Sequence, residues 1–197
     1  MHMKRMINDP NSRSDAGTDD MWTYSQQFGK VMLLYHEVEK DCSDELPSSG
    51  IYRLFFLLKG KARLKIGSED EYLLNDKEFT LLPPGCPVVC SALVSSGYVI
   101  INCNRIKISS NRSYLAELKK EGKKGIVPCR QLPIRGRFMK VLTDFEYYPV
   151  SENMYPSLYD ILFIYMRILY SKEELLSFLY PVLFGDGGEA RIEGNNK

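Results

Sequence analysis

Between residues 52 and 103 the chain consists of short apolar runs separated by turn-forming residues, with no internal sequence repeat. Tyr52 to Leu58 forms the first run, and Lys59-Gly60 supplies its turn. From 61 to 66 basic and apolar side chains alternate, which is the period of a strand with one solvated face. Short strands at such close spacing predict a mainly β fold, either a sandwich or a barrel. Further apolar runs follow at 71–74, 78–82, 88–94 and 98–103.

After residue 104 the apolar period changes to that of helices. A polar helix is expected over 113–124 and a linker over 128–133. Apolar residues then fall at i, i+3, i+4 and i+7 around 138–145, and the stripe recurs over 158–170. Because the link between these two segments is short, they are expected to form a helical hairpin. Ser171-Lys172-Glu173-Glu174 has the form of a capping box and predicts one more helix start.

These patterns divide the chain into four parts. Residues 1–22 are polar and are expected to form a disordered leader, and 185–197 a frayed tail. The β region spans 23–108 and the helical region 109–184. With 197 residues and 44% hydrophobic content, the chain has room for one globular domain. A formal net charge of +1 argues against a nucleic-acid surface spread over the whole chain.

The composition limits the possible chemistry. The chain has two histidines, so a histidine-based centre would depend on His36, which we expect at a surface or edge position. Cys86 and Cys90 would stand roughly 13 Å apart on a strand, too far for a disulfide. Five scattered cysteines therefore indicate reduced thiols in a cytoplasmic protein. The apolar stretch 158–170 is too short for a membrane span.

The segment 75–85, Asn-Asp-Lys-Glu-Phe-Thr-Leu-Leu-Pro-Pro-Gly, joins a turn, an apolar strand and a rigid stop. It resembles the second conserved motif of cupins, and the hairpin over 56–64 resembles the strand pair before that motif. With the helical region, the chain is similar over about residues 30–184 to the N-terminal sensory domain of AraC-type transcriptional regulators. The resemblance implies a cupin-like (jelly-roll) barrel followed by three to four C-terminal helices. It also implies binding of a small metabolite, such as a sugar, and dimerisation.

Two departures from these families qualify what the resemblance implies. Metal-binding cupins have a His-x-His before the turn and another histidine after the Pro-Pro-Gly, whereas here no histidine follows His36. We therefore expect no metal and no other cofactor. AraC-type regulators also carry two helix-turn-helix units after the helical segment. Nothing after Gly185 can form a recognition helix, so we expect no DNA binding by this chain.

An effector pocket in a small barrel would be lined by alternate strand residues. Aromatic residues supply apolar area, and a tyrosine hydroxyl can orient a ligand. The Pro83-Pro84-Gly85 turn is expected at the barrel rim, with Phe79, Leu81 and Val89 facing inward or into the core. The predicted wall residues of the pocket are Tyr52, Phe56, Cys90 and Tyr98.

The expected helix over 158–170 is apolar almost all round, so it needs cover on every side. We expect a second subunit to provide that cover, in a homodimer with Phe163 and Met166 near the middle of its interface. The alternative is that the helix beginning near Glu173 folds back over it. The predicted interface comprises Leu158, Ile161, Leu162, Phe163, Tyr165, Met166 and Leu169.

Two other functions remain open at this point. A cupin-type isomerase, epimerase or dioxygenase would need a bound metal or a convergent acid–base set, which the sequence does not display. We therefore expect no enzymatic activity. A dimerisation module without a ligand would have a barrel interior filled with Leu, Phe and Ile side chains.

Overall fold

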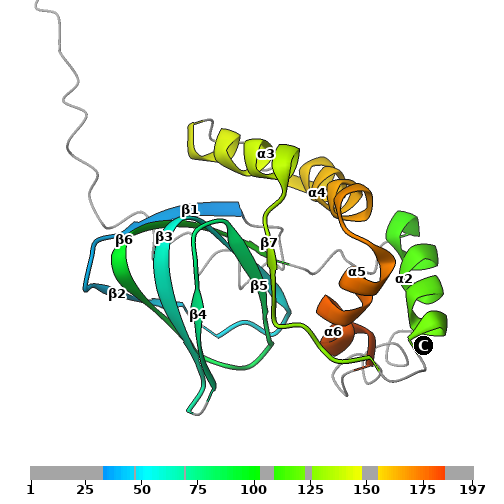
Figure 1. Cartoon of the computed structure of the whole chain (residues 1–197), viewed down its shortest axis with the longest axis horizontal. Coiled ribbons are helices and arrows are strands. Elements are labelled where there is room, and N and C mark those ends of the chain that lie inside the picture. Colours follow the sequence, from blue (N-terminus) through cyan, green and yellow to red (C-terminus); the bar gives the residue numbers. More distant parts are fainter. Residues whose placement is uncertain are drawn as a thin grey trace, which may run out of the picture.

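The computed structural model describes residues 33–46, 48–68, 70–102, 109–122, 126–147 and 155–184. It places a curled β-sheet, called the barrel below, beside a group of helices, with one strand crossing between them (Figure 1). The expectations for residues 1–22 and 185–197 lie outside the described residues. None of the described helices has the length and hydrophobicity of a transmembrane segment.

Seven strands of the described residues form one antiparallel sheet in the order β1-β6-β3-β5-β7, with β2 paired to β6 and β4 paired to β3. Their bounds are β1 Leu33–Val38, β2 Ser43–Leu46, β3 Arg53–Ile66, β4 Asp70–Leu74, β5 Glu78–Leu82, β6 Val88–Asn102 and β7 Gln131–Pro133. The predicted mainly β region followed by helices is confirmed. β7 lies in the expected linker, which is a correction: three residues with one buried side chain carry no period that could reveal a strand.

The two long strands, β3 and β6, bend midway, and this bend shapes the barrel. Their register shifts between Leu57 and Ala62. Gly60 lies in the bend with φ 95°, and a Cβ there would be 2.6 Å from the backbone oxygen of Ser95. An irregular register lets a strand turn and changes which residues face inward. Phe55 and Leu57 accordingly face the barrel interior before the bend, whereas Ala62 and Leu64 do so after it.

Two hydrophobic cores result, one on each face of the sheet. The barrel interior buries Phe55, Leu57, Leu64, Leu82 and Tyr98 among others. The outer face, called the outer core below, packs against the helices and is rich in aromatic contacts. The Phe79 ring is 5.0 Å from Phe56, 6.0 Å from Phe138, 5.6 Å from Tyr170 and 4.8 Å from Phe178, centre to centre.

The helical region consists of α2 Ser109–Glu121, α3 Gly136–Tyr147, α4 Tyr155–Leu169, α5 Lys172–Phe178 and α6 Tyr180–Phe184. α3 packs against α4, as a helical hairpin requires. The capping box at the start of α5 is confirmed: the Ser171 hydroxyl accepts from the Glu174 backbone, and the Glu174 side chain accepts from the Ser171 backbone.

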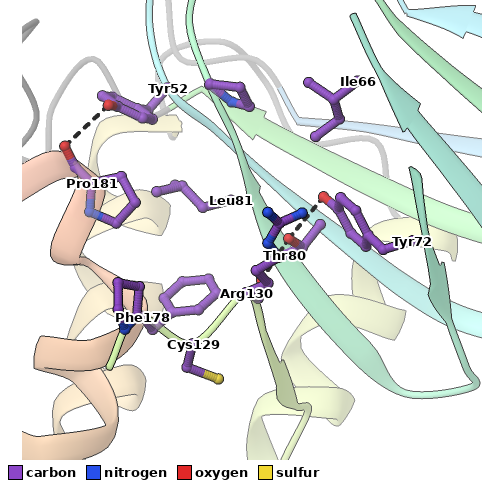
Figure 2. A pocket seen from close by; sticks show the side chains of 11 residues that line it. Tyr52, Ile66, Tyr72, Thr80, Leu81, Cys129, Arg130, Phe178 and Pro181 are labelled. Atoms are coloured by element: carbon purple, nitrogen blue, oxygen red, sulfur yellow. Dashed lines mark hydrogen bonds between the residues drawn. The ribbon is translucent and has the colours of Figure 1, made fainter. Parts of the chain in front are cut away.

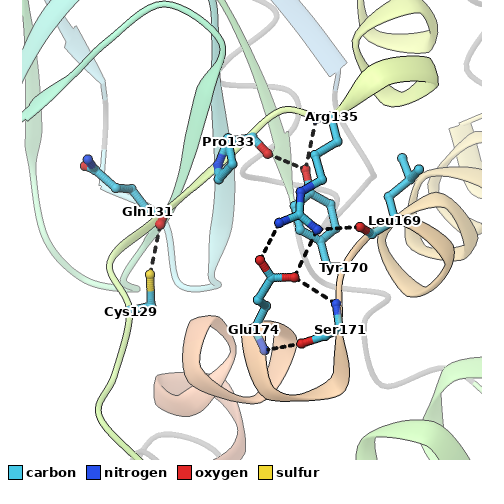
Figure 3. A network of polar contacts seen from close by, with 8 residues as sticks. All are labelled: Cys129, Gln131, Pro133, Arg135, Leu169, Tyr170, Ser171 and Glu174. Atoms are coloured by element: carbon cyan, nitrogen blue, oxygen red, sulfur yellow. Dashed lines mark hydrogen bonds and ion pairs between the residues drawn. The ribbon is translucent and has the colours of Figure 1, made fainter.

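A polar cluster, called the Arg135 clamp below, fastens the helices to β7 (Figure 3). The Arg135 guanidinium donates to the Leu169 carbonyl at 2.6 Å and forms a two-pronged ion pair with Glu174. The Tyr170 hydroxyl donates to the Pro133 carbonyl at 2.6 Å, and the guanidinium lies over its ring at 4.7 Å. Because β7 pairs with β5, the clamp connects the end of α4 and the start of α5 to the sheet.

Candidate functional site

A pocket of about 290 Å³ lies where the end of β5, the segment before β7 and the helices α5 and α6 meet (Figure 2). That volume is close to the lower end of the usual range for ligand sites. β7 pairs with β5 only at Glu78, Phe79 and Thr80, so the end of β5 lacks this neighbour and the pocket forms beside it. Its lining residues are Tyr52, Ile66, Tyr72, Thr80, Leu81, Pro83, Pro128, Cys129, Arg130, Phe178 and Pro181.

The barrel side of the pocket carries a short chain of hydrogen bonds. The Thr80 hydroxyl donates to the Arg130 carbonyl at 2.7 Å and is 3.0 Å from the Tyr72 hydroxyl. Thr80 is buried, and its contact with the backbone at Arg130 fixes the segment that leads into β7. This wall therefore offers hydroxyl groups held in place by their neighbours.

The helix side of the pocket is mostly apolar. Phe178 of α5 and Pro181 of α6 line this side, close to Leu81 of β5 (Figure 2). The Tyr52 hydroxyl donates to the Pro181 carbonyl at 3.1 Å, and burial raises the pKa of this tyrosine. A single pocket thus has one wall from the barrel and one from α5 and α6.

Arg53 begins β3 at the same end of the barrel. It is 1% exposed, yet its Nε, Nη1 and Nη2 atoms have no hydrogen-bond partner among the described residues. In the sheet it lies opposite Leu82 and Asn102, and it shares a face with Phe55. Burial lowers the pKa of the guanidinium, which nevertheless stays charged.

A second polar group, formed by His36, Asp44 and Tyr98, combines the buried Tyr98 with an Asp44 side chain that is 35% exposed. The Tyr98 hydroxyl donates to Asp44, and His36 Nδ1 is 3.6 Å from the same carboxylate. The imidazole stacks on the Tyr98 ring at 5.2 Å. Burial lowers the pKa of His36, although Asp44 opposes this, and burial together with Asp44 raises that of Tyr98.

His36 was expected at a surface or edge position. It lies on β1, at the end of the strand order, but its side chain is only 11% exposed, so the surface alternative is wrong. Among the residues that the structure describes, no three His, Cys, Asp or Glu side chains gather closely enough to hold a metal ion. The His36 group does not contain a third such ligand.

Of the predicted pocket residues, the structure places only Tyr52 in this pocket. Phe56 lies on the other face of the sheet, stacked on Phe79 in the outer core. Cys90 and Tyr98 are fully buried in the barrel interior, and burial raises the pKa of the Cys90 thiol to about 12. Phe79 and Leu81 also pack in the outer core, and Val89 is half-buried between the inward-facing Val88 and Cys90.

Several lining residues were missed for a physical reason. Thr80 was read as part of an apolar strand, and Arg130 and Cys129 as linker, because a pocket between distant segments leaves no local pattern. Arg53 was included in the apolar run from Tyr52 to Leu58 and was not singled out. An arginine directly before Leu-Phe-Phe-Leu-Leu was a usable signal, since charged side chains are rarely placed inside such a run.

The predicted dimer interface also needs correction. Leu162, Phe163 and Met166 are 3%, 2% and 1% exposed, so they belong to the protomer's own core. The cover for Phe163 includes Tyr114 of α2, at a ring distance of 6.4 Å. Tyr165 and Leu169 are half-buried, and the Leu158 side chain lies outside the described residues.

The exposed apolar face of α4 is a different one. Ile161, Ile164 and Ile168 are 43%, 50% and 71% exposed, at positions i, i+3 and i+7 of the helix. We call them the isoleucine stripe. Of these three, only Ile161 was among the predicted interface residues.

No protein-family model and no curated protein sequence matches the chain. Similar solved structures include a conserved protein of unknown function from Streptococcus pyogenes, with 18% identity over 37% of this chain and 63% of that one, at a TM-score of 0.34. A cupin superfamily protein from Desulfitobacterium hafniense shares 14% identity over 37% of this chain and 66% of that one, at 0.34. A Bacillus subtilis oxalate decarboxylase variant shares 14% over 37% and 21%, at 0.33. The matched region spans less than two-thirds of each of these proteins, and at such TM-scores we base no argument on them.

Proposed function

We propose that this chain is the effector-binding and dimerisation part of an AraC-type transcriptional regulator, with a metal-free cupin-like barrel and no catalytic activity. The observation that supports this is the pocket with one wall from the barrel and one from α5 and α6. A ligand held there touches both layers and favours one arrangement of them over another. In this proposal the chain is cytoplasmic, binds a small metabolite, and contacts neither DNA nor membrane itself.

The contacts around the pocket suggest how a movement of α5 on ligand binding would be transmitted to α4. The pocket lining includes Cys129, whose backbone donates to the Ser177 carbonyl of α5. The Arg135 clamp then joins β7 and α5 to the last residue of α4, Leu169. A shift of α5 against β5 would thus be passed to the end of α4, beside Ile168.

We assign the isoleucine stripe to a second copy of this chain. An antiparallel pairing of two α4 helices about Ile164 brings Ile161 and Ile168 of both copies together. It also places Asp160 of one copy beside the partner's Arg167, so charges of opposite sign flank the apolar centre. Self-complementary charge and exposed branched side chains at one helix face favour this partner over an unrelated one.

The dimer is tested by Ile164→Glu, with Val94→Glu as the control. Both residues are exposed apolar side chains, at 50% and 45%, but Val94 lies on the barrel. Light scattering at micromolar concentration should give a dimer for the wild type and Val94→Glu, and a folded monomer for Ile164→Glu. Equal masses for the two variants would refute the assignment of this face.

Effector binding is tested by filling the pocket. A panel of metabolites, monosaccharides included, is screened for compounds that raise the melting temperature. Cys129→Trp places a large ring in the pocket, whereas Val127→Trp, on the same segment but 79% exposed, does not. Stabilisation should persist in Val127→Trp and vanish in Cys129→Trp. A compound that stabilises all three proteins equally binds elsewhere and would count against this pocket.

The packed barrel interior favours a second candidate, a dimerisation module without a ligand. Phe55, Leu57 and Leu64 are completely buried there, so the space that a cupin would keep for a ligand is largely filled. This candidate predicts a dimer sensitive to Ile164→Glu and no stabilising compound in the screen.

A further inference from the structure

Arg53 raises a question of charge balance. A guanidinium cannot release its proton at neutral pH, so burial leaves it charged. Burying a charge without a partner is costly, and native proteins almost always pair such groups. Arg53 is 1% exposed and its three nitrogens donate to no described residue. The fold therefore contains a fixed positive charge that something else can neutralise.

The position of Arg53 relates it to the pocket. Ile66, Tyr72 and Thr80 line the pocket from inside the barrel. Arg53 pairs with Leu82, and Phe55, two residues further along β3, pairs with Thr80. Arg53 and Thr80 are thus diagonal neighbours on one face, about 7–8 Å apart at the backbone, which is within reach of an arginine side chain. Asn102 lies opposite Arg53 on β6 and adds a buried amide on the same face.

The charges near this end of the barrel have one sign. The eleven lining residues include the cation Arg130 and no Asp or Glu. The interior carboxylate of Asp44 already accepts from Tyr98 and lies next to His36. A ligand in the pocket thus meets Arg130 and hydroxyl groups between apolar walls, and Arg53 lies behind this lining.

We propose that the ligand is a small carboxylate whose charged group pairs with Arg53, while its apolar body occupies the pocket beside Leu81 and Phe178. The planar fork of a guanidinium matches the two oxygens of a carboxylate. This proposal rests on the proposed function, because it names the class of effector for the same pocket.

The test uses formate and benzoate, with benzamide as the neutral analogue of benzoate. Formate is the smallest carboxylate, so it tests pairing with Arg53 without the apolar body of a larger ligand. Melting temperatures are measured at constant ionic strength set with sodium chloride, for the wild type, Arg53→Met and Arg63→Met. Arg63 is an exposed arginine of the same strand, paired with Glu71, and serves as the matched control.

Formate should raise the melting temperature of the wild type and of Arg63→Met in a saturable manner, by about 3–6 °C at ten times its Kd. Arg53→Met should show no rise, and benzamide none on any protein. Equal responses of wild type and Arg53→Met, or no response to either carboxylate, would overturn the proposal. In that case, light scattering of Ile164→Glu and the neutral compounds of the screen still decide the proposed function separately.

If Arg53→Met does not fold, the Nε–H signal of Arg53 replaces it. The signal is assigned in a ¹H–¹⁵N spectrum of the wild type by its absence in Arg53→Lys. Formate should shift this signal and leave that of Arg63 in place. An unmoved Arg53 signal at saturating formate would refute carboxylate binding there.

Discussion

The two faces of the same sheet are packed by different means. The outer core is built from aliphatic and aromatic side chains, with Phe79 at the centre of four ring contacts. The barrel interior is equally buried but includes Arg53, Thr80, Asn102 and the polar group around Tyr98. The same three strands, β3, β5 and β6, supply both faces.

This difference implies that the two faces of the sheet have different roles, one in stability and one in ligand recognition. Apolar packing stabilises through burial and depends on shape, whereas buried polar groups stabilise only when they are paired. The outer core should therefore dominate the free energy of unfolding and fix the helices to the barrel. The interior should contribute less net stability and carry the groups that can recognise a ligand.

The largest effect is expected from Phe79→Ala. Removing this ring leaves a cavity bordered by four aromatic side chains and should cost about 3–5 kcal/mol of unfolding free energy in urea titrations. Leu81→Ala, two positions away on the same face but half-buried, is the control and should cost clearly less. Similar losses of unfolding free energy for the two variants would show that the ring contacts of Phe79 do not dominate the stability of the outer core.

Tyr98→Phe tests how much a polar contact in the barrel interior contributes to stability. The change keeps the ring and its stacking on Phe55 at 4.6 Å but removes the hydrogen bond to Asp44. Hydrogen bonds to charged groups contribute about 1.5–3 kcal/mol, and the partial exposure of Asp44 places the expected loss near the lower limit. A double-mutant cycle with Asp44→Asn measures the pair directly. A coupling near zero would mean that the interior is held by packing alone.

Arg135→Met tests the clamp between the two regions. Its ion pair with Glu174 is partly exposed, so we expect a loss of about 1 kcal/mol that shrinks as salt is added. The exposed Arg137, two residues further along at the start of α3, supplies the control, Arg137→Met. The hydrogen bond to the Leu169 carbonyl predicts that hydrogen exchange at the end of α4 accelerates in Arg135→Met only.

The smallest effect concerns pH and His36. Burial holds the pKa of the folded residue below 6.5, so the unfolded chain binds the proton more readily. His36 therefore contributes to the free energy of unfolding above pH 6.5, and this contribution is lost as the pH falls toward the lowered pKa of the folded residue. Urea titrations between about pH 7.5 and 5.5 should show wild-type stability falling, and His36→Gln should flatten that part of the slope. An unchanged slope would show that His36 does not titrate in this window.

The sequence was informative where a local pattern sufficed. The strand over 78–82 and the capping box at Ser171 depend on neighbouring residues, and both were predicted. The expected turn at Lys59-Gly60 was wrong, because β3 continues through it and only bends there. The exposed side of α4 was not predicted, because Ile161, Ile164 and Ile168 satisfy the helical period as well as Leu162 and Met166 do. The helices packed around α4, which include α3 and α5, decide which set is buried. β7 and the pocket were missed for the same reason, since both arise from segments far apart in the chain.

β7 also has a consequence for the order in which the protein can fold. During synthesis the strands β1 to β6 are complete by residue 102, but the partner of the β5 edge arrives only with residues 131–133. The side chains that cover Phe56 and Phe79 come later still, from Phe138 and from α4, α5 and α6. Until then the outer face of the sheet is an uncovered aromatic patch, the kind of surface that promotes aggregation. We therefore expect a barrel cut at residue 108 to aggregate, because this face would stay uncovered.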